Sequence, residues 1–137
     1  MTTSPDPASI LAAARSVSER WLAAVNNRDL ETLLSLYAMS SVLLPTFSPH
    51  IIREDVRRRE YFTRLSQRPG LTVSLHEKTF TAQAVGQVAV ASGIYCFRFE
   101  IDGEPYAFEA RFTFVIDPQS ERPIVHHHSS QIPRTME

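Results

Sequence analysis

Residues 88–116 read VAVASGIYCFRFEIDGEPYAFEARFTFVI, and this stretch decides the fold. Apolar and polar side chains alternate along it, which is the pattern of a β-strand with one buried face. Asp102-Gly103 interrupts the alternation with two residues that adopt positive φ cheaply, as a tight hairpin turn requires. The stretch therefore predicts two long antiparallel strands joined at residues 102–104.

The predicted hairpin sets two aromatic rows opposite each other. The rows consist of Tyr95, Phe97, Phe99, Tyr106, Phe108, Phe112 and Phe114, and a polar row from Arg98 to Thr113 occupies the other face. If a sheet of such long strands curls round a helix, we expect the aromatic rows on the outside and the polar row facing a cavity. Exposed apolar surface of that extent predicts burial in a homo-oligomer, with a dimer as the simplest form.

The residues before Gly70 have a helical period instead. Asp6-Pro7 is a helix-start signal, and the apolar stripe of the helix that follows consists of Ile10, Ala14, Val17, Trp21 and Val25. We expect a short second helix after Asp29 with Tyr37 on its buried face, a brief strand in SVLLPT (41–46), and a third helix over residues 54–66. Helices followed by antiparallel strands predict an α+β fold, with three helices packed in a strongly curved, mainly antiparallel sheet. The length of 137 residues predicts one domain, 1–137.

Composition excludes several classes of protein. The formal charge is −1, and the only basic run, Arg57-Arg58-Arg59, is flanked by acidic residues, so we interpret it as a solvated helix face and expect no nucleic-acid partner. No run approaches the roughly 18 apolar residues of a membrane helix, and the start MTTSPDPAS does not have the pattern of a secretory signal. The single cysteine, Cys96, fits a reducing compartment and is expected to be a small buried residue. A cytoplasmic location is the default expectation.

The stretch IVHHHSSQIP (124–133) holds the candidate chemistry. On a strand its side chains divide into two sets: His126, His128 and Ser130 face one way, while His127 and Ser129 face the other. The first set has the spacing of two zinc ligands, and a third from His50 or His76 would complete a three-histidine site. The alternative is that these imidazoles are hydrogen-bonded to neighbouring strands. The sequence alone does not choose between the two faces.

Several motifs in this order resemble a known family. They are W-x3-V-x3-D (21–29), LYA (36–38), VLLPT (42–46), EYF (60–62), SGIYCF (92–97), ARFTFVI (110–116) and IVHHHSSQIP (124–133). The chain resembles the branch of the nuclear-transport-factor-2-like (SnoaL-like) superfamily named for the association domain of calcium/calmodulin-dependent protein kinase. Within it, the HHHSS ending is similar to that of the iota-class carbonic anhydrases and of the SgcJ/EcaC-type proteins. The resemblance implies a cone-shaped domain with a pocket at its open end, and dimers or larger rings.

The resemblance also implies a set of site residues. A metal-independent bicarbonate pocket of the iota type corresponds to Thr46, Tyr61, His127 and Ser129, and Arg111 corresponds to a pocket arginine of the kinase hub domains. A guanidinium and several hydroxyls suit a planar anion such as bicarbonate. Tyr61, His127 and Ser129 would then pass a proton from water attacking carbon dioxide, with His127 titrating near neutrality and with no metal or other cofactor.

Two other functions fit the same resemblance. One is a non-catalytic oligomeric module that binds a small anion, and the other is an accessory tailoring protein of secondary metabolism. The chain departs from the family at Met39-Ser40-Ser41, where an acidic residue is usual, and this lowers the case for an isomerase or dehydratase. It departs again at Glu121-Arg122-Pro123, where the family often has Gly-x-Trp, and this leaves the edge of the last strand and the oligomer geometry open.

Overall fold

The computed structural model describes residues 6–133, so both ends of the predicted 1–137 domain lie outside the described residues. The helices are α1 (Pro7–Asn26), α2 (Leu30–Ser35) and α3 (Asp55–Ser66), with a 3-10 turn, η1 (Glu77–Thr79). The strands are β1 (Tyr37–Leu44), β2 (Thr72–Leu75), β3 (Thr81–Val85), β4 (Val88–Ile101), β5 (Glu104–Ile116) and β6 (Ile124–Gln131). Among the described residues, none of the helices combines the length and the hydropathy needed to span a membrane.

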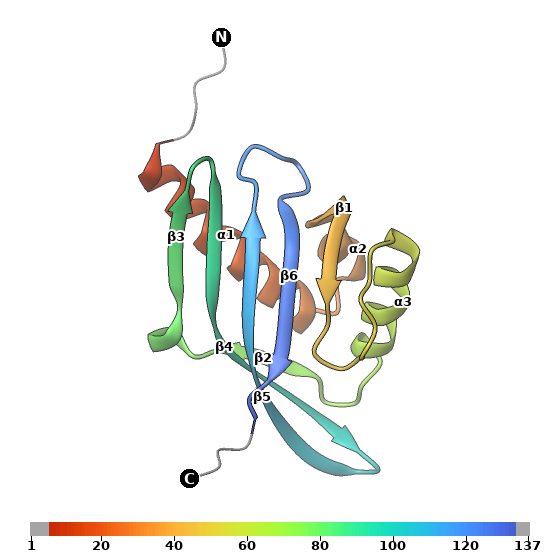
Figure 1. Cartoon of the computed structure of the whole chain (residues 1–137). Coiled ribbons are helices and arrows are strands. Elements are labelled where there is room, and N and C mark those ends of the chain that lie inside the picture. Colours follow the sequence, from red (N-terminus) through yellow and green to blue (C-terminus); the bar gives the residue numbers. More distant parts are fainter. Residues whose placement is uncertain (1–5, 134–137) are drawn as a thin grey trace.

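The strands form one curved mixed sheet in the order β1-β6-β5-β4-β2, and β3 also pairs with β4 (Figure 1). The β4–β5 hairpin pairs from Ala89 with Ile116 to Ile101 with Glu104, and positive φ at Asp102 and Gly103 makes its two-residue turn. β1 runs parallel to β6, and every other pairing is antiparallel. The predicted α+β fold with a mainly antiparallel sheet is confirmed.

The aromatic rows line the inner face of the sheet and not its outside. Helix α1 crosses that face (Figure 1), and its Trp21 stacks on Tyr95 at 5.4 Å and packs against Phe97 and Phe114. The expectation of an outer aromatic face is therefore wrong. The apolar stripe of α1 is buried only if it packs against another apolar surface. The sheet therefore curves with its aromatic face toward the helix and its polar row toward solvent.

Two further expectations are corrected near α2 and α3. Tyr37 is the first residue of β1 and not part of α2, because the helix ends at Ser35. Arg58 does not belong to the solvated face of α3: its side chain is fully buried and donates to the carbonyl oxygens of Met39 and Ser41, at 3.2 and 3.1 Å. These bonds tie α3 to β1 and hold it beside the edge of the sheet.

Candidate functional site

The last strand turns the middle histidine of the HHHSS motif inward. His127 is 2% exposed and Ser129 is 3% exposed, whereas His128 and Ser130 lie on the solvent side of the sheet. In the ladder, His127 pairs with Phe114 and Ser129 pairs with Phe112, two residues of the inner aromatic row. The strand therefore presents His127 and Ser129, and not His128 and Ser130, to the inside of the cone.

His127 lies inside a fully hydrogen-bonded aromatic cluster. Its Nδ1 is 2.7 Å from the hydroxyl of Tyr37, its Nε2 is 3.2 Å from the hydroxyl of Tyr95, and Trp21 Nε1–H donates to Tyr37 at 2.8 Å. Burial, and to a smaller extent His126 and His128, lowers the pKa of His127 to about 3. The expectation that this imidazole titrates near neutrality is wrong, because charging it would place an unpaired cation in an apolar core.

A hydroxyl cluster continues from this core toward solvent. The hydroxyls of Thr46 and Ser129 are hydrogen-bonded at 2.5 Å, and both also interact with the hydroxyl of Tyr95. Burial raises the pKa of Tyr95 well above its usual range, so its phenol stays protonated. The family resemblance implied Thr46 and Ser129 in one site, but it did not include Tyr95 and Tyr37, which the structure places beside them.

Tyr61 is the outermost member of this hydroxyl cluster and lies beside the surface of the molecule. Its oxygen accepts a hydrogen bond from the backbone N–H of Phe47 at 3.2 Å and also interacts with the hydroxyl and the backbone N–H of Thr46. Burial raises the pKa of Tyr61 to about 12, against the lowering effect of these hydrogen bonds. The phenol is therefore protonated at neutral pH and has a hydrogen to donate.

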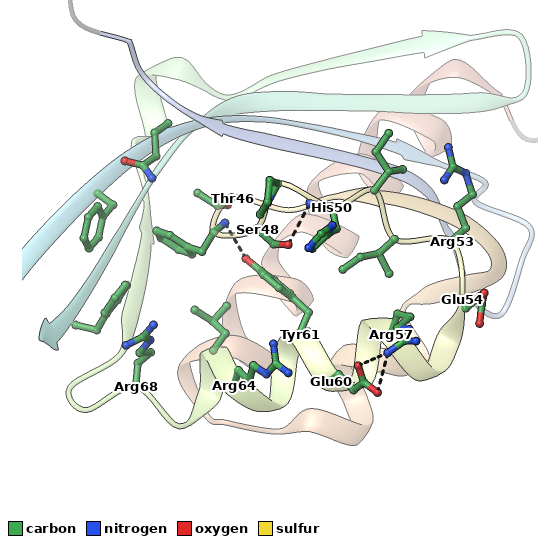
Figure 2. Close-up of a pocket in the computed structure, with 18 of the residues that line it drawn as sticks. Thr46, Ser48, His50, Arg53, Glu54, Arg57, Glu60, Tyr61, Arg64 and Arg68 are labelled. Atoms are coloured by element: carbon green, nitrogen blue, oxygen red, sulfur yellow. Dashed lines mark hydrogen bonds and ion pairs between the residues drawn. The ribbon is translucent and has the colours of Figure 1, made fainter.

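A large open cleft adjoins Tyr61. It encloses about 1270 Å³ between the loop after β1, helix α3 and the far end of the β4–β5 hairpin (Figure 2). The lining is of two kinds. Ile52, Leu65, Phe99, Ile101 and Phe108 provide apolar surface, and Arg53, Arg57, Arg64, Arg68, Glu54 and Glu60 are charged. The cleft therefore suits a molecule with an apolar part and a negative group.

Three of the arginines in the cleft differ in their partners. Arg57 pairs with Glu60 at 3.0 Å, and Arg68 lies over the ring of Phe99 at 5.4 Å. Arg64 is exposed one helical turn beyond Tyr61, and within residues 6–133 its guanidinium has no ion pair or side-chain hydrogen bond. Tyr61 and Arg64 thus offer a neutral donor and a cation on one wall of the cleft (Figure 2).

The structure brings four of the five predicted site residues together and leaves out Arg111. Thr46, Tyr61, Ser129 and His127 lie in one cluster of polar side chains around Tyr95. Arg111 is exposed on the outer face of the sheet, paired in the ladder with Ile94 and Ser130. The expectation that Arg111 lines the pocket is contradicted, because the inward position of Phe112 turns its neighbour outward. The helical spacing of Tyr61 and Arg64 could have identified Arg64 instead.

The three-histidine alternative is not formed in residues 6–133. His128 lies on the outer face of the sheet, whereas His50 lines the cleft and His76 contacts Glu109 at 3.5 Å. The described residues contain no group of three histidine, cysteine or carboxylate side chains that could share a metal ion. The alternative pair of His126 and His128 therefore gains no third ligand from His50 or His76.

Comparison with solved structures places this arrangement in a known fold. A protein from Xanthomonas campestris, solved as a candidate calcium/calmodulin-dependent protein kinase II association domain, is 24% identical, with a TM-score of 0.79 over 98% of this chain and 100% of that one. An NTF2-like family protein from Streptomyces avermitilis, named as a candidate dehydratase, is 13% identical, with a TM-score of 0.79 over 93% and 100%. A candidate ketosteroid isomerase from Shewanella frigidimarina is 18% identical, with a TM-score of 0.68 over 86% and 94%.

The helices held in a curved, unclosed sheet thus define an NTF2-like domain with a pocket at its open end. Residues 13–133 match the model of the calcium/calmodulin-dependent protein kinase II association domain, and the chain belongs to that family. A search of curated proteins finds no match.

Proposed function

We propose that this protein binds a small organic acid or bicarbonate, with the carboxylate at Tyr61 and Arg64. The main support for this proposal is that the protonated phenol of Tyr61 and the unpaired guanidinium of Arg64 lie on one wall of an open cleft. A carboxylate accepts hydrogen bonds from both groups, and its charge is neutralised by the arginine. Solved proteins of this fold named as a candidate dehydratase, an epoxide hydrolase and a candidate ketosteroid isomerase support a small-molecule pocket.

The size of the cleft supports an acid with an apolar part. A volume of about 1270 Å³ exceeds what bicarbonate needs, and Phe99, Phe108 and Ile101 offer apolar surface in the same hollow. Bicarbonate is the smallest ligand of the proposed class, and an aromatic acid such as benzoate would fill more of the space. Burial of its ring against these side chains would add affinity that bicarbonate does not have.

The catalytic form of the proposal is metal-independent hydration of carbon dioxide. The oxygen of a water molecule attacks the carbon, and one C=O electron pair moves to the oxygen that accepts from Tyr61. The proton of the water passes to the exposed imidazole of His50, which lines the same cleft, and then to solvent. Ser129 and His127 would position the phenol through the hydroxyl cluster, and bicarbonate would leave past Arg64.

A binding role without turnover is the second candidate. Both ring nitrogens of His127 are occupied by tyrosine hydroxyls, and its lowered pKa of about 3 makes it a poor proton acceptor at neutral pH. Without a metal, nothing else in the cluster lowers the pKa of the attacking water as zinc does.

Titration of bicarbonate, acetate and benzoate, followed by chemical shifts of backbone amides, tests the binding proposal. We expect saturable shifts at Phe47 and Tyr61, and Tyr61→Phe or Arg64→Gln should weaken binding by about tenfold, the value of one charge-assisted hydrogen bond. Arg59→Gln is the matched control, because Arg59 pairs with Glu31 at 2.8 Å and does not line the cleft. Shifts that do not saturate, or equal affinity in all three variants, would contradict the proposal.

Stopped-flow hydration of carbon dioxide, with and without a chelator, separates catalysis from binding. The catalytic form predicts a rate above that of buffer that survives chelation and falls in Tyr61→Phe and in His50→Gln. A rate equal to that of buffer at high protein concentration, together with saturable acetate binding, would leave the binding module as the function.

A further inference from the structure

A chain of polar groups, hydrogen-bonded from Trp21 to Tyr95 and again between Ser129 and Thr46, connects the centre of the core to the cleft. It begins at Trp21 Nε1–H and passes through the hydroxyl of Tyr37, the ring of His127 and the hydroxyl of Tyr95. It then reaches the paired hydroxyls of Ser129 and Thr46 and ends at Tyr61. Every group in the chain except Trp21 can both donate and accept a hydrogen bond in its neutral form.

Trp21 differs because an indole N–H can only donate. The Tyr37 oxygen already accepts from Trp21 at 2.8 Å, so the Tyr37 hydrogen is free to point at Nδ1 of His127, 2.7 Å away. Nδ1 is then unprotonated, and a neutral imidazole carries its hydrogen on Nε2. In the opposite tautomer, Tyr37 would accept twice and its own O–H would be buried without an acceptor.

The tautomer of His127 sets which group donates and which accepts in the hydrogen bonds between His127 and Tyr61. Nε2–H of His127 donates to the oxygen of Tyr95, so the Tyr95 hydrogen points away from the histidine and toward Ser129 and Thr46. With the Tyr95 hydrogen on the Ser129 oxygen, the Ser129 hydroxyl donates to Thr46, and the Thr46 hydroxyl is left to donate to Tyr61. The Tyr61 oxygen also accepts from the Phe47 N–H, so its own hydrogen is free to be donated to a ligand in the cleft that Tyr61 lines.

We propose that Trp21 is the positioning residue that orients this chain, so that Tyr61 always offers a hydrogen to the ligand and selects molecules that accept one. This inference rests on the proposed function and adds its specificity: carboxylates and carbonyl compounds fit, whereas an ammonium group does not. It also assigns Nε2–H as the resting tautomer of His127, and this tautomer cannot take up a proton from the cleft through the chain.

The tautomer of His127 can be read directly by NMR of histidine labelled with nitrogen-15. In the native protein at neutral pH we expect the Nε2–H form to exceed the Nδ1–H form by at least about tenfold, the equivalent of one buried hydrogen bond. A predominant Nδ1–H form or a doubly protonated ring would overturn the inference without recourse to any variant.

Two variants and a control test the role of Trp21. Trp21→Phe frees the Tyr37 oxygen to accept from the histidine, so the tautomer ratio should fall by about tenfold. Tyr37→Phe keeps the ring of residue 37 and should reduce the ratio in the same direction. Phe114→Leu removes packing from the same imidazole, 4.3 Å from its ring centroid, but no hydrogen bond, so the ratio should not change. A ratio that is unaltered in a folded Trp21→Phe, or altered equally in Phe114→Leu, would overturn the proposal.

Ligand binding separates this inference from the function on which it rests. Acetate should bind and ethylammonium should not, as judged by saturable shifts at Tyr61. A Nε2–H tautomer without acetate binding would overturn the proposed function and leave the direction of the chain standing. Acetate binding with a Nδ1–H tautomer would overturn the role of Trp21 and leave the proposed function standing.

Discussion

The hydroxyls of Thr46 and Ser129 lie 2.5 Å apart, although 83 residues separate them in the chain. Thr46 belongs to the loop after β1, and Ser129 belongs to β6, the strand that runs parallel to β1. This contact fixes the loop that carries Phe47 and His50 along the cleft. It therefore joins the buried histidine cluster to the surface on which a ligand would lie.

Removal of either hydroxyl is expected to destabilise the fold, and the two losses should not add. Thr46→Val keeps the shape of the side chain but leaves Ser129 with fewer partners, at a cost of about 1–2 kcal/mol. Ser129→Ala should cost a similar amount, and the double variant should cost less than the sum by about 1 kcal/mol. Urea unfolding of the four proteins measures this coupling, and strict additivity would show that the contact contributes nothing.

Acid should destabilise the protein through His127. The pKa of this imidazole is about 3 in the folded protein and 6.5 without the fold, so the unfolded chain binds the proton first as pH falls. The stabilising effect of a neutral His127 is fully present above about pH 6.5 and is lost as pH falls from there toward 3, at up to about 1.4 kcal/mol per pH unit.

Denaturant unfolding measured between pH 7 and pH 4 checks this slope. His127→Gln should be less stable at pH 7 but should flatten the dependence on pH, because the titrating group is gone. His50→Gln is the control, since His50 is exposed and its removal should leave the slope intact. An equal slope in native protein and His127→Gln would contradict the prediction.

Arg58 should matter more to stability than its neighbours in the arginine run. Its buried guanidinium donates to two carbonyl oxygens of β1, which an ammonium group cannot reach with the same fork geometry. Arg58→Lys is expected to cost about 2 kcal/mol, whereas the exposed Arg59→Lys should stay within about 0.5 kcal/mol. Thermal and urea unfolding measure both, and equal stabilities would place Arg58 among the ordinary surface residues.

The homo-oligomer stays a prediction, but its first basis is largely gone, because only Tyr106 of the aromatic rows is exposed, at 48%. The face now open to a second copy is the outer face of the sheet, where half-buried Val90, Ile94 and Val115 alternate with Arg111 and His128. We expect a dimer by light scattering, and Arg111→Glu should shift it toward the monomer. Arg57→Glu, on α3, is the control that should not. A monomer at high concentration would contradict the prediction.

The sequence by itself determined most of the elements and which side chains share a face. The alternation from Val88 to Ile116, the Asp102-Gly103 turn and the stripe of α1 are local patterns, and a local period is sufficient to define a strand, a turn or a helix. The motif resemblance placed Thr46, Tyr61, His127 and Ser129 in one site, and the structure gathers these four. Their roles in binding or catalysis are proposals that the experiments above address.

Only the tertiary structure decided which face of the sheet is inside. Strand alternation separates two faces but does not say which one is buried, and that choice depends on the apolar stripe of α1, about 70 residues away in the chain from the strand it covers. Packing of the helices on this face leaves Arg111 on the outer face of the sheet and buries Arg58 against β1. It also brings Trp21 and Tyr37 next to His127. Packing between distant elements settles these positions, because burial free energy depends on what each face meets and not on the sequence next to it.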